Sequence, residues 1–203
     1  MTHVDSRAAD GYVALTFDDG PNPATTGALL DALRSAGVRA TCFNVGRHVQ
    51  AEPALARAQR AAGMWVANHS WTHAHLTRLD TVRMTSELAR TQRAVRRATG
   101  TTPRLFRPPY GETNAALQAV ASGLGLTEVL WSVDSQDWNG AGTDRIVRAA
   151  STLQPGGVLL MHDGHQAAID AVPQIVADLT ARGLRAGMIS TATGRAVAPD
   201  GSP

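Results

Sequence analysis

Two adjacent carboxylates and two histidines four residues apart are the groups in this sequence best suited to chemistry. Asp18 and Asp19 stand side by side, and His69 and His73 bracket the tripeptide Ser-Trp-Thr. One carboxylate and two imidazoles make up the three-ligand set of a catalytic zinc site, which keeps a coordination position open for water. The second carboxylate remains free to act as a base. These residue types indicate a metal-activated hydrolase.

The two aspartates are expected to have different tasks. Successive side chains of an extended strand point to opposite faces, so one aspartate would bind metal while the other acts as base. Taken alone, Asp-Asp-Gly-Pro is typical of an ordinary turn, and the two histidines are compatible with polar loop positions. The combination of both motifs with His162 downstream favours the metal site. His75 and His165 lie close by in the sequence, but a third imidazole ligand is not required.

The elements that position these residues alternate between strands and helices. The first helix is expected to open at Asn22-Pro23 and the longest to run between Asp80 and Gly100. About seven such units imply parallel strands joined by crossover helices. Strands are expected at residues 12–17, 40–44, 65–67, 105–106, 127–133, 157–161 and 185–189.

The polar residues of five expected strand ends decide between two parallel architectures. A barrel gathers all its strand ends on one face, whereas an open doubly wound sheet gathers ligands chiefly at one switch point. The sequence therefore predicts an α/β fold built as a barrel. An eight-fold barrel needs about 250 residues, so 203 residues predict a distorted, incomplete one. The strand-end residues are Asp18-Asp19, His69 and His73, Arg107–Tyr110, Asp134–Trp138, and His162.

Length and composition narrow the remaining possibilities. With 203 residues, 43% of them apolar, the chain is expected to form a single domain over residues 1–203. Its core would span about 11–193, and residues 194–203 would be a tail or the start of a linker. No apolar run is long enough to cross a membrane, and the N-terminus does not have the pattern of a signal peptide.

The basic residues and the cysteine are expected to have no catalytic task. The densest basic run lacks interleaved aromatic residues, so it is expected to be a solvated helix face and not a nucleic-acid site. Cys42 is the only cysteine, and its apolar neighbours predict an inert thiol in the core. The basic run comprises Arg90, Arg93, Arg96 and Arg97.

Five motifs in order resemble those of polysaccharide deacetylases of carbohydrate esterase family 4, the NodB-homology group. The resemblance covers residues 11–193 and is greatest to secreted bacterial members that act on acetylxylan and chitin oligomers. It implies a distorted barrel of β/α units, which agrees with the pattern of elements. It also implies a secreted protein with an acetylated polysaccharide as its partner, and we expect a monomer. The motifs are Thr16–Pro21, His69–His73, Arg107–Gly111, Asp134–Trp138 and Leu160–His162.

The resemblance assigns the reacting groups. Asp18 would be the catalytic base, and His162 would be the general acid that protonates the leaving nitrogen or oxygen. One divalent ion would be bound, with Zn²⁺ expected and Co²⁺ or Ni²⁺ as substitutes. Its ligands would be Asp19, His69 and His73.

The resemblance also assigns supporting groups. Arg107 would pair with Asp18 and hold it ionised, while Asp137 would orient and tune the acid. Tyr110 would contribute a backbone N–H to stabilise the oxyanion. Trp138 and Leu160 would form a pocket for the acetyl methyl group. Two further expectations are that Asp134 contacts substrate or buttresses its loop, and that Trp65, Trp71 and Trp131 belong to the core or rim.

The sequence therefore predicts a metal-dependent hydrolase that removes acetyl groups from β-1,4-linked polysaccharides. The expected substrates are first the N-acetyl groups of chitin oligomers and second the O-acetyl groups of xylan. The alternative activities are deacetylation of peptidoglycan N-acetylglucosamine and a strict acetylxylan esterase. A non-haem iron oxygenase also uses two histidines and one carboxylate, but Asp18 and His162 would have no matched role in it. A carbohydrate-binding module with a vestigial site conflicts with an intact acid, base and ligand set.

Overall fold

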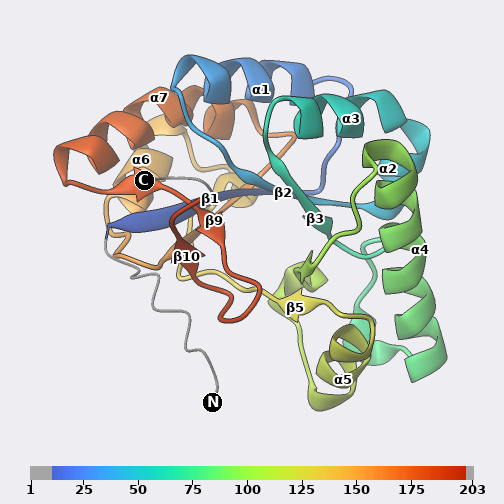
Figure 1. The fold of residues 1–203 in the computed structure, drawn as a ribbon. Coiled ribbons are helices and arrows are strands. Elements are labelled where there is room, and N and C mark those ends of the chain that lie inside the picture. Colours follow the sequence, from blue (N-terminus) through green and yellow to red (C-terminus); the bar gives the residue numbers. More distant parts are fainter. Residues whose placement is uncertain (1–10, 200–203) are drawn as a thin grey trace.

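The computed structural model describes residues 11–199 of the chain as strands alternating with helices (Figure 1). The strands are β1 (Tyr12–Asp18), β2 (Thr41–Asn44), β3 (Trp65–Asn68), β4 (Leu105–Phe106), β5 (Thr127–Glu128), β6 (Val133–Asp134), β7 (Val158–His162), β8 (Arg185–Ala186), β9 (Met188–Ile189) and β10 (Ala196–Val197). The helices are α1 (Thr26–Ser35), α2 (Gly46–Ala51), α3 (Pro53–Ala61), α4 (Thr81–Thr99), α5 (Ala115–Gly123), α6 (Thr143–Ala150) and α7 (Gln166–Ala181). Short 3₁₀ turns are η1 (Leu76–Arg78), η2 (Pro109–Gly111) and η3 (Asp137–Asn139).

The parallel strands form a sheet in the order β5-β4-β3-β2-β1-β7-β6, and β8 pairs with the start of β1. β5 and β6 lie at opposite ends of this order, although only residues 129–132 separate them in the sequence. The sheet must therefore curl until its two ends meet at that segment. The prediction of a distorted, incomplete (β/α) barrel is confirmed.

The expectation of one strand over residues 127–133 is wrong, because this segment bends around a buried arginine. The carbonyl oxygens of Val129 and Leu130 accept hydrogen bonds from Arg107 Nε and Nη2, both at 3.2 Å. These carbonyls are thus used by a side chain and not by a neighbouring strand. Two strands of two residues remain, β5 and β6, one on each side of the bend.

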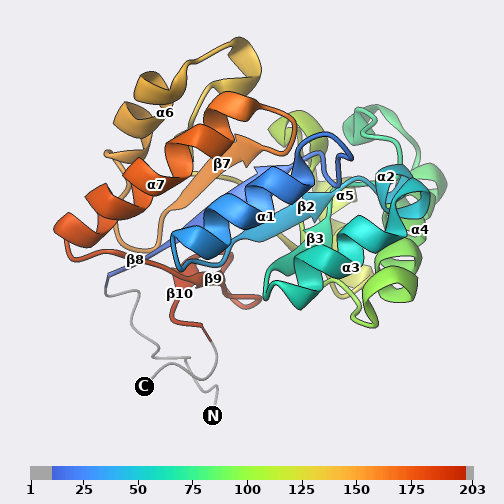
Figure 2. The same ribbon diagram turned by 90° about the horizontal axis from the view of Figure 1, so that it is seen from above.

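Alternation along β1 divides its side chains between two environments. Val13, Leu15 and Phe17 pack in the cluster formed with the helices α1 and α7, which lie side by side across the outside of the sheet (Figure 2). Ala14 belongs to the cluster inside the curled sheet. Thr16 and Asp18 follow Ala14 at the period of two expected for a strand, so they share its face. The last residue of β1 therefore points into the barrel.

Helix boundaries agree with prediction in one case and differ in another. α4 begins after Asp80, whose Oδ1 accepts a hydrogen bond from the Arg83 backbone at 2.8 Å, and it ends at Gly100 with φ 75°. Both predicted ends are confirmed. α1 begins only at Thr26, because Asn22 forms a turn in which its carbonyl oxygen accepts from the Thr26 backbone at 2.9 Å.

The segment expected as a tail contributes a strand. β10 pairs antiparallel with β9, and Ala196 is fully buried. Part of the expected linker is thus packed against the sheet, whereas residues 200–203 lie outside the described part of the chain. Cys42 is buried as predicted, and burial raises the pKa of its thiol. Over residues 11–199, none of the helices is both long and apolar enough to cross a bilayer.

Candidate active site

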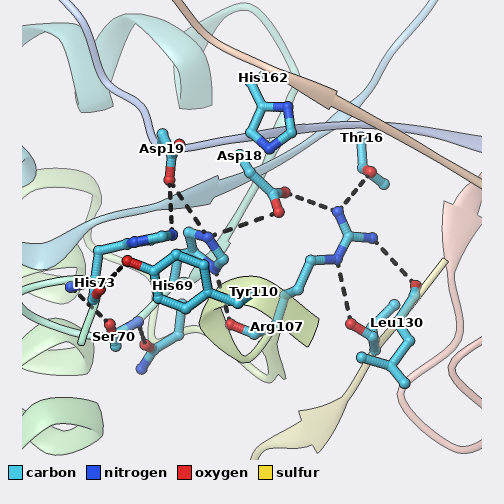
Figure 3. A network of polar contacts seen from close by, with 12 residues as sticks. Thr16, Asp18, Asp19, His69, Ser70, His73, Arg107, Tyr110, Leu130 and His162 are labelled. Carbon is cyan, nitrogen blue, oxygen red and sulfur yellow. Dashed lines mark hydrogen bonds and ion pairs between the residues drawn. The ribbon is translucent and has the colours of Figure 1, made fainter. Parts of the chain in front are cut away.

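A cavity of about 320 Å³ opens at the carboxyl ends of the strands and collects most of the predicted site. Nine of the eleven predicted residues line it; Arg107 and Asp137 lie directly behind two of them. Figure 3 shows the central group of carboxylates and imidazoles with their polar contacts. The nine lining residues are Asp18, Asp19, His69, His73, Tyr110, Asp134, Trp138, Leu160 and His162.

Three of these residues form a set that can hold a metal ion. Asp19 Oδ1 lies 3.4 Å from His69 Nε2 and 3.3 Å from His73 Nε2, and the three candidate ligand atoms are all within 4.8 Å of one another. Asp19 Oδ1 is buried and has no hydrogen-bond partner within residues 11–199. A buried carboxylate oxygen without a partner is costly, and a bound cation would remove that cost. The donor set therefore fits a divalent metal.

The protonation of these ligands also suits a cation. His69 Nδ1 is 2.8 Å from the carbonyl oxygen of Arg107, so the proton belongs on Nδ1 and the lone pair of Nε2 faces Asp19. Burial alone would raise the pKa of Asp19, but His69, His73 and His162 outweigh it and hold that pKa below its ordinary range. Burial and the nearby His69 lower the pKa of His73. Metal ligands must be deprotonated, and both shifts favour that form.

The loops that carry the site have an unusual backbone. All non-glycine residues with positive φ over residues 11–199 follow the ends of β1, β3, β4 or β6. Left-handed conformations are costly for residues with a Cβ, and they persist where surrounding contacts impose them. These residues are Asp19 (φ 70°), Ser70 (63°), His73 (63°), Tyr110 (62°) and Gln136 (60°).

Glu87 of α4 holds the loop between the two histidines. Its Oε2 accepts hydrogen bonds from the backbone N–H groups of Trp71 and Thr72 at 2.9 and 2.8 Å, and its Oε1 accepts from Thr72 Oγ1 at 3.0 Å. The His73 N–H donates to Ser70 Oγ at 3.0 Å. Sequence reasoning missed Glu87, because an acidic residue on a polar helix gives no signal of a contact 15 residues away.

Asp18 lies against Arg107, as the resemblance implies. Arg107 is fully buried and donates from Nη1 to Asp18 Oδ1 at 2.7 Å and to Thr16 Oγ1 at 2.8 Å (Figure 3). Its guanidinium also lies 4.2 Å from the ring centroid of Phe43. Asp18 Oδ2 remains 3.7 Å from His69 Nε2. One carboxylate oxygen is therefore engaged by the arginine while the other faces the ligand set.

His162 and Asp137 form the second predicted pair. Asp137 Oδ1 lies 2.8 Å from His162 Nδ1, and its Oδ2 accepts from the His162 backbone N–H at 2.7 Å. Burial would lower the pKa of His162, but the hydrogen bond to Asp137 and the charge of Asp18 outweigh it and raise that pKa above its ordinary value. The ring points toward the Asp18 carboxylate (Figure 3), leaving Nε2 as its free nitrogen.

Comparison with known proteins identifies the family of this chain. The family model described as polysaccharide deacetylase matches residues 5–129. The chain is 47% identical over 191 residues to the bifunctional xylanase/xylan deacetylase of Cellvibrio japonicus, covering 93% of this chain and 29% of that protein. This chain belongs to the polysaccharide deacetylase family. The predicted membership of carbohydrate esterase family 4 is confirmed.

Two further proteins are similar to this polysaccharide deacetylase. A chitooligosaccharide deacetylase of Bradyrhizobium is 42% identical over 155 residues, which cover 75% of this chain and 71% of that protein. The family 4 carbohydrate esterase of Streptomyces lividans, solved in complex with acetate, superposes with a TM-score of 0.92 and 58% identity. That superposition covers 95% of this chain and all of the other. The chain thus matches nearly the whole of one relative and less than a third of another.

The deacetylase pocket is bounded by the predicted apolar residues Trp138 and Leu160. Asp134 accepts a hydrogen bond from the Trp138 indole N–H at 3.3 Å and from the Gln136 backbone at 2.8 Å. These hydrogen bonds support the loop that carries Asp134, which is one of the two tasks expected of this residue. Trp131 also lines the pocket, although its sequence context predicts only a core or rim position.

Two further histidines, His75 and His165, stand outside the ligand set. His75 Nδ1 lies 3.0 Å from Glu112, and its ring stacks on Tyr110 with centroids 4.0 Å apart. The centroid of the His165 ring is 5.9 Å from that of His162. Neither residue belongs to the group that could hold a metal. Their contacts indicate support for Tyr110 and a place beside the predicted acid.

Proposed function

We propose that this polysaccharide deacetylase is a metal-dependent hydrolase that removes acetyl groups from β-1,4-linked polysaccharides. N-acetyl groups of chitin oligomers and O-acetyl groups of xylan are its proposed substrates, in line with the chitooligosaccharide and xylan deacetylases to which it is similar. The observation that carries the proposal is a single cavity in which Asp18 and His162 lie beside the three residues that could hold a metal ion. We further propose a secreted monomer.

Asp19, His69 and His73 would hold one divalent ion. Mixed nitrogen and oxygen ligands suit a borderline ion, for which we propose Zn²⁺. When bound, such an ion supplies polarisation of the acetyl carbonyl and lowers the pKa of water.

Asp18 is the proposed base. Arg107 engages its Oδ1 at 2.7 Å, which orients the carboxylate and leaves Oδ2 available toward the cavity. Oδ2 would accept a proton from the attacking water as its oxygen bonds to the acetyl carbon. Arg107 is itself held by Thr16 and the carbonyls of Val129 and Leu130, so it offers Asp18 a partner fixed in place.

His162 is the proposed acid. Its Nδ1 is engaged by Asp137, so the proton it delivers is on Nε2. That proton would pass to the sugar nitrogen or oxygen as the C–N or C–O bond breaks, and acetate would leave as the second product. Raising the pKa of His162 keeps its ring protonated toward higher pH.

The apolar side of the cavity would set a loose specificity. Trp138 and Leu160 line it, and we propose that they contact the acetyl methyl group, which N-acetyl and O-acetyl sugars share. The backbone N–H of Tyr110 is proposed to stabilise the developing oxyanion. Tyr110 itself is 55% exposed, so its ring is also available to a polymer lying across the strand ends.

Acetate release from three polymers tests this function. Wild-type protein loaded with Zn²⁺ is incubated with chitin oligomers, acetylxylan and peptidoglycan, and Asp18→Asn protein serves as the control. We expect acetate from chitin oligomers and acetylxylan with the wild type alone. Release from acetylxylan only would replace the proposal by a strict esterase, and a strong preference for peptidoglycan would move the substrate there. No release from any of them would overturn the function.

A further inference from the structure

A second cavity, of about 330 Å³, lies among α2, α3 and α4 and shares no lining residue with the candidate active site. Four arginines line it, and no aspartate or glutamate does. We call this cavity the arginine groove. Its arginines are Arg57 of α3 and Arg90, Arg93 and Arg97 of α4.

The arginine groove adds to one expectation from the sequence, because all four arginines of the basic run are exposed, as predicted for a solvated helix face. Arg90, Arg93 and Arg97 are spaced by three and four residues, so they share one face of α4. That face borders a cavity and meets Arg57 of a neighbouring helix, and only Arg96 of the basic run lies outside the groove. None of the four lining arginines forms an ion pair with a carboxylate in the described part of the chain. Their positive charges are therefore available to a ligand.

The groove is shaped for more than a simple ion. The Arg90 guanidinium lies 4.2 Å from the ring centroid of Trp71. The indole is held in turn against Gly46, where a Cβ would come within 2.5 Å of the ring. Two small apolar side chains, Ala94 and Ala98, also line the groove. Guanidinium groups together with an aromatic ring and small apolar side chains suit a sugar ring that carries a negative charge.

The groove also lies close to the proposed site of reaction. His48 and Ala51 of α2 line a cavity that includes Asp19 and His162, whereas Val49 and Gln50 of the same helix line the arginine groove. The six-residue helix α2 thus stands between the arginine groove and this third cavity, which shares Asp19 and His162 with the candidate active site. A polymer held in the groove would present its neighbouring sugars near the active site.

We propose that the arginine groove binds the carboxylates of uronic acid residues in a polysaccharide. Guanidinium groups pair with carboxylates in a bidentate manner. The choice of a polysaccharide rests on the proposed function, whereas the preference for anions rests on the groove alone. The groove would anchor an acidic polymer while a neighbouring acetylated sugar enters the active site.

Calorimetric titration with defined oligomers tests the proposal. The probes are hexagalacturonate, a glycerol-phosphate hexamer, neutral xylohexaose and a single-stranded oligodeoxynucleotide of equal charge. We expect hexagalacturonate to bind, more weakly as salt rises from 50 to 200 mM, and xylohexaose to bind much less. Equal binding of xylohexaose, or tighter binding of the glycerol-phosphate hexamer or of the oligonucleotide, would overturn the proposal.

Matched variants locate the binding. Arg93→Ala/Arg97→Ala removes two groove arginines, and Arg96→Ala removes an exposed arginine of the same helix that lies outside the groove. We expect the double variant to weaken anion binding about tenfold or more and the control to change it little. Equal losses in both would refute the groove. Melting curves check the fold, and unchanged acetate release from short neutral oligosaccharides would separate this result from any failure of the proposed function.

Discussion

The groups proposed to move protons and the groups proposed to hold the metal reach the same cavity by different means. Asp18 and His162 end the neighbouring parallel strands β1 and β7, and they are partners in the sheet register. Their separation follows from the spacing of about 4.8 Å between paired strands. Asp19 and His73 instead lie just beyond strand ends, in left-handed conformations. The ligand set is thus shaped by loops and the proton-transfer pair by the sheet.

Distant side chains support the two halves of the site in different ways. Backbone pairing of β1 and β7 sets the spacing of Asp18 and His162, and Arg107 and Asp137 orient their side chains. The loop that carries His69 and His73 is held by side chains: Glu87 accepts hydrogen bonds from its backbone, and Asn68 Oδ1 accepts from Ser70 N–H at 2.9 Å. Substitution of Glu87 or Asn68 should therefore disturb metal binding before it disturbs proton transfer.

Metal removal should have the largest effect, because it takes away the ion that Asp19, His69 and His73 are proposed to hold. We expect chelation to abolish acetate release and Zn²⁺ or Co²⁺ to restore it, since the ligands combine nitrogen and oxygen donors. Elemental analysis before and after chelation measures the metal content. Full activity in protein shown to be free of metal would refute the mechanism.

Asp18→Asn and Asp19→Ala should distinguish proton transfer from metal binding at adjacent positions. Asp18→Asn should retain metal and lose about 10²–10⁴-fold in turnover, because only the base is removed. Asp19→Ala should lose metal affinity, since it removes one of three ligands. Metal titration together with acetate release measures both effects. Loss of metal in Asp18→Asn with retention in Asp19→Ala would reverse the assignment.

His162→Ala should discriminate among leaving groups. On an N-acetyl sugar we expect a loss of about 10²–10⁴-fold, because the amine must be protonated as it departs. An activated aryl acetate needs no such help and should lose far less. Steady-state rates on the two substrates, at equal metal content, give the comparison. Equal losses would place the acid elsewhere, with His165 the first residue to examine.

Glu87→Gln should weaken metal binding, although Glu87 does not line the cavity. Replacing the carboxylate removes an acceptor and a charge from the loop between the metal ligands, so we expect metal affinity to fall about tenfold. Asp31→Asn is the control, because it removes an exposed carboxylate that pairs with Arg34 on α1. Competition with a metal indicator measures the affinities. Unchanged affinity in Glu87→Gln would show that the loop holds its shape unaided.

Asp137→Asn should give the smallest effect, a displacement of the pH profile. The acid acts only when protonated, so turnover falls as pH rises through the pKa of His162. Asp137 raises that pKa, and losing its charge should move the alkaline limb toward lower pH. Profiles of kcat for both proteins measure the shift. A limb that stays in place would mean that another group controls it.

The predicted site residues were accessible from the sequence because they follow strands. Strands of four to seven residues are recognisable by their apolar runs, and parallel strand ends converge on one edge, so Asp18, His69 and His162 could be grouped from the sequence. Glu87 and Thr16 could not be found in this way. Their contacts span 15 and 91 residues, and no local pattern encodes the partner of a polar side chain.

What the sequence by itself determined is the family and the class of fold, a parallel α/β barrel, together with the residues proposed as acid, base and metal ligands, because residue types and short-range periodicity are local properties. Only the tertiary structure decided where the barrel is interrupted, between β5 and β6, and which side chains support its loops. Arg107 bends residues 129–132 out of a strand, and α3 and α4 turn a basic run into the arginine groove. These features arise where segments distant in sequence pack together, so only the folded chain specifies them.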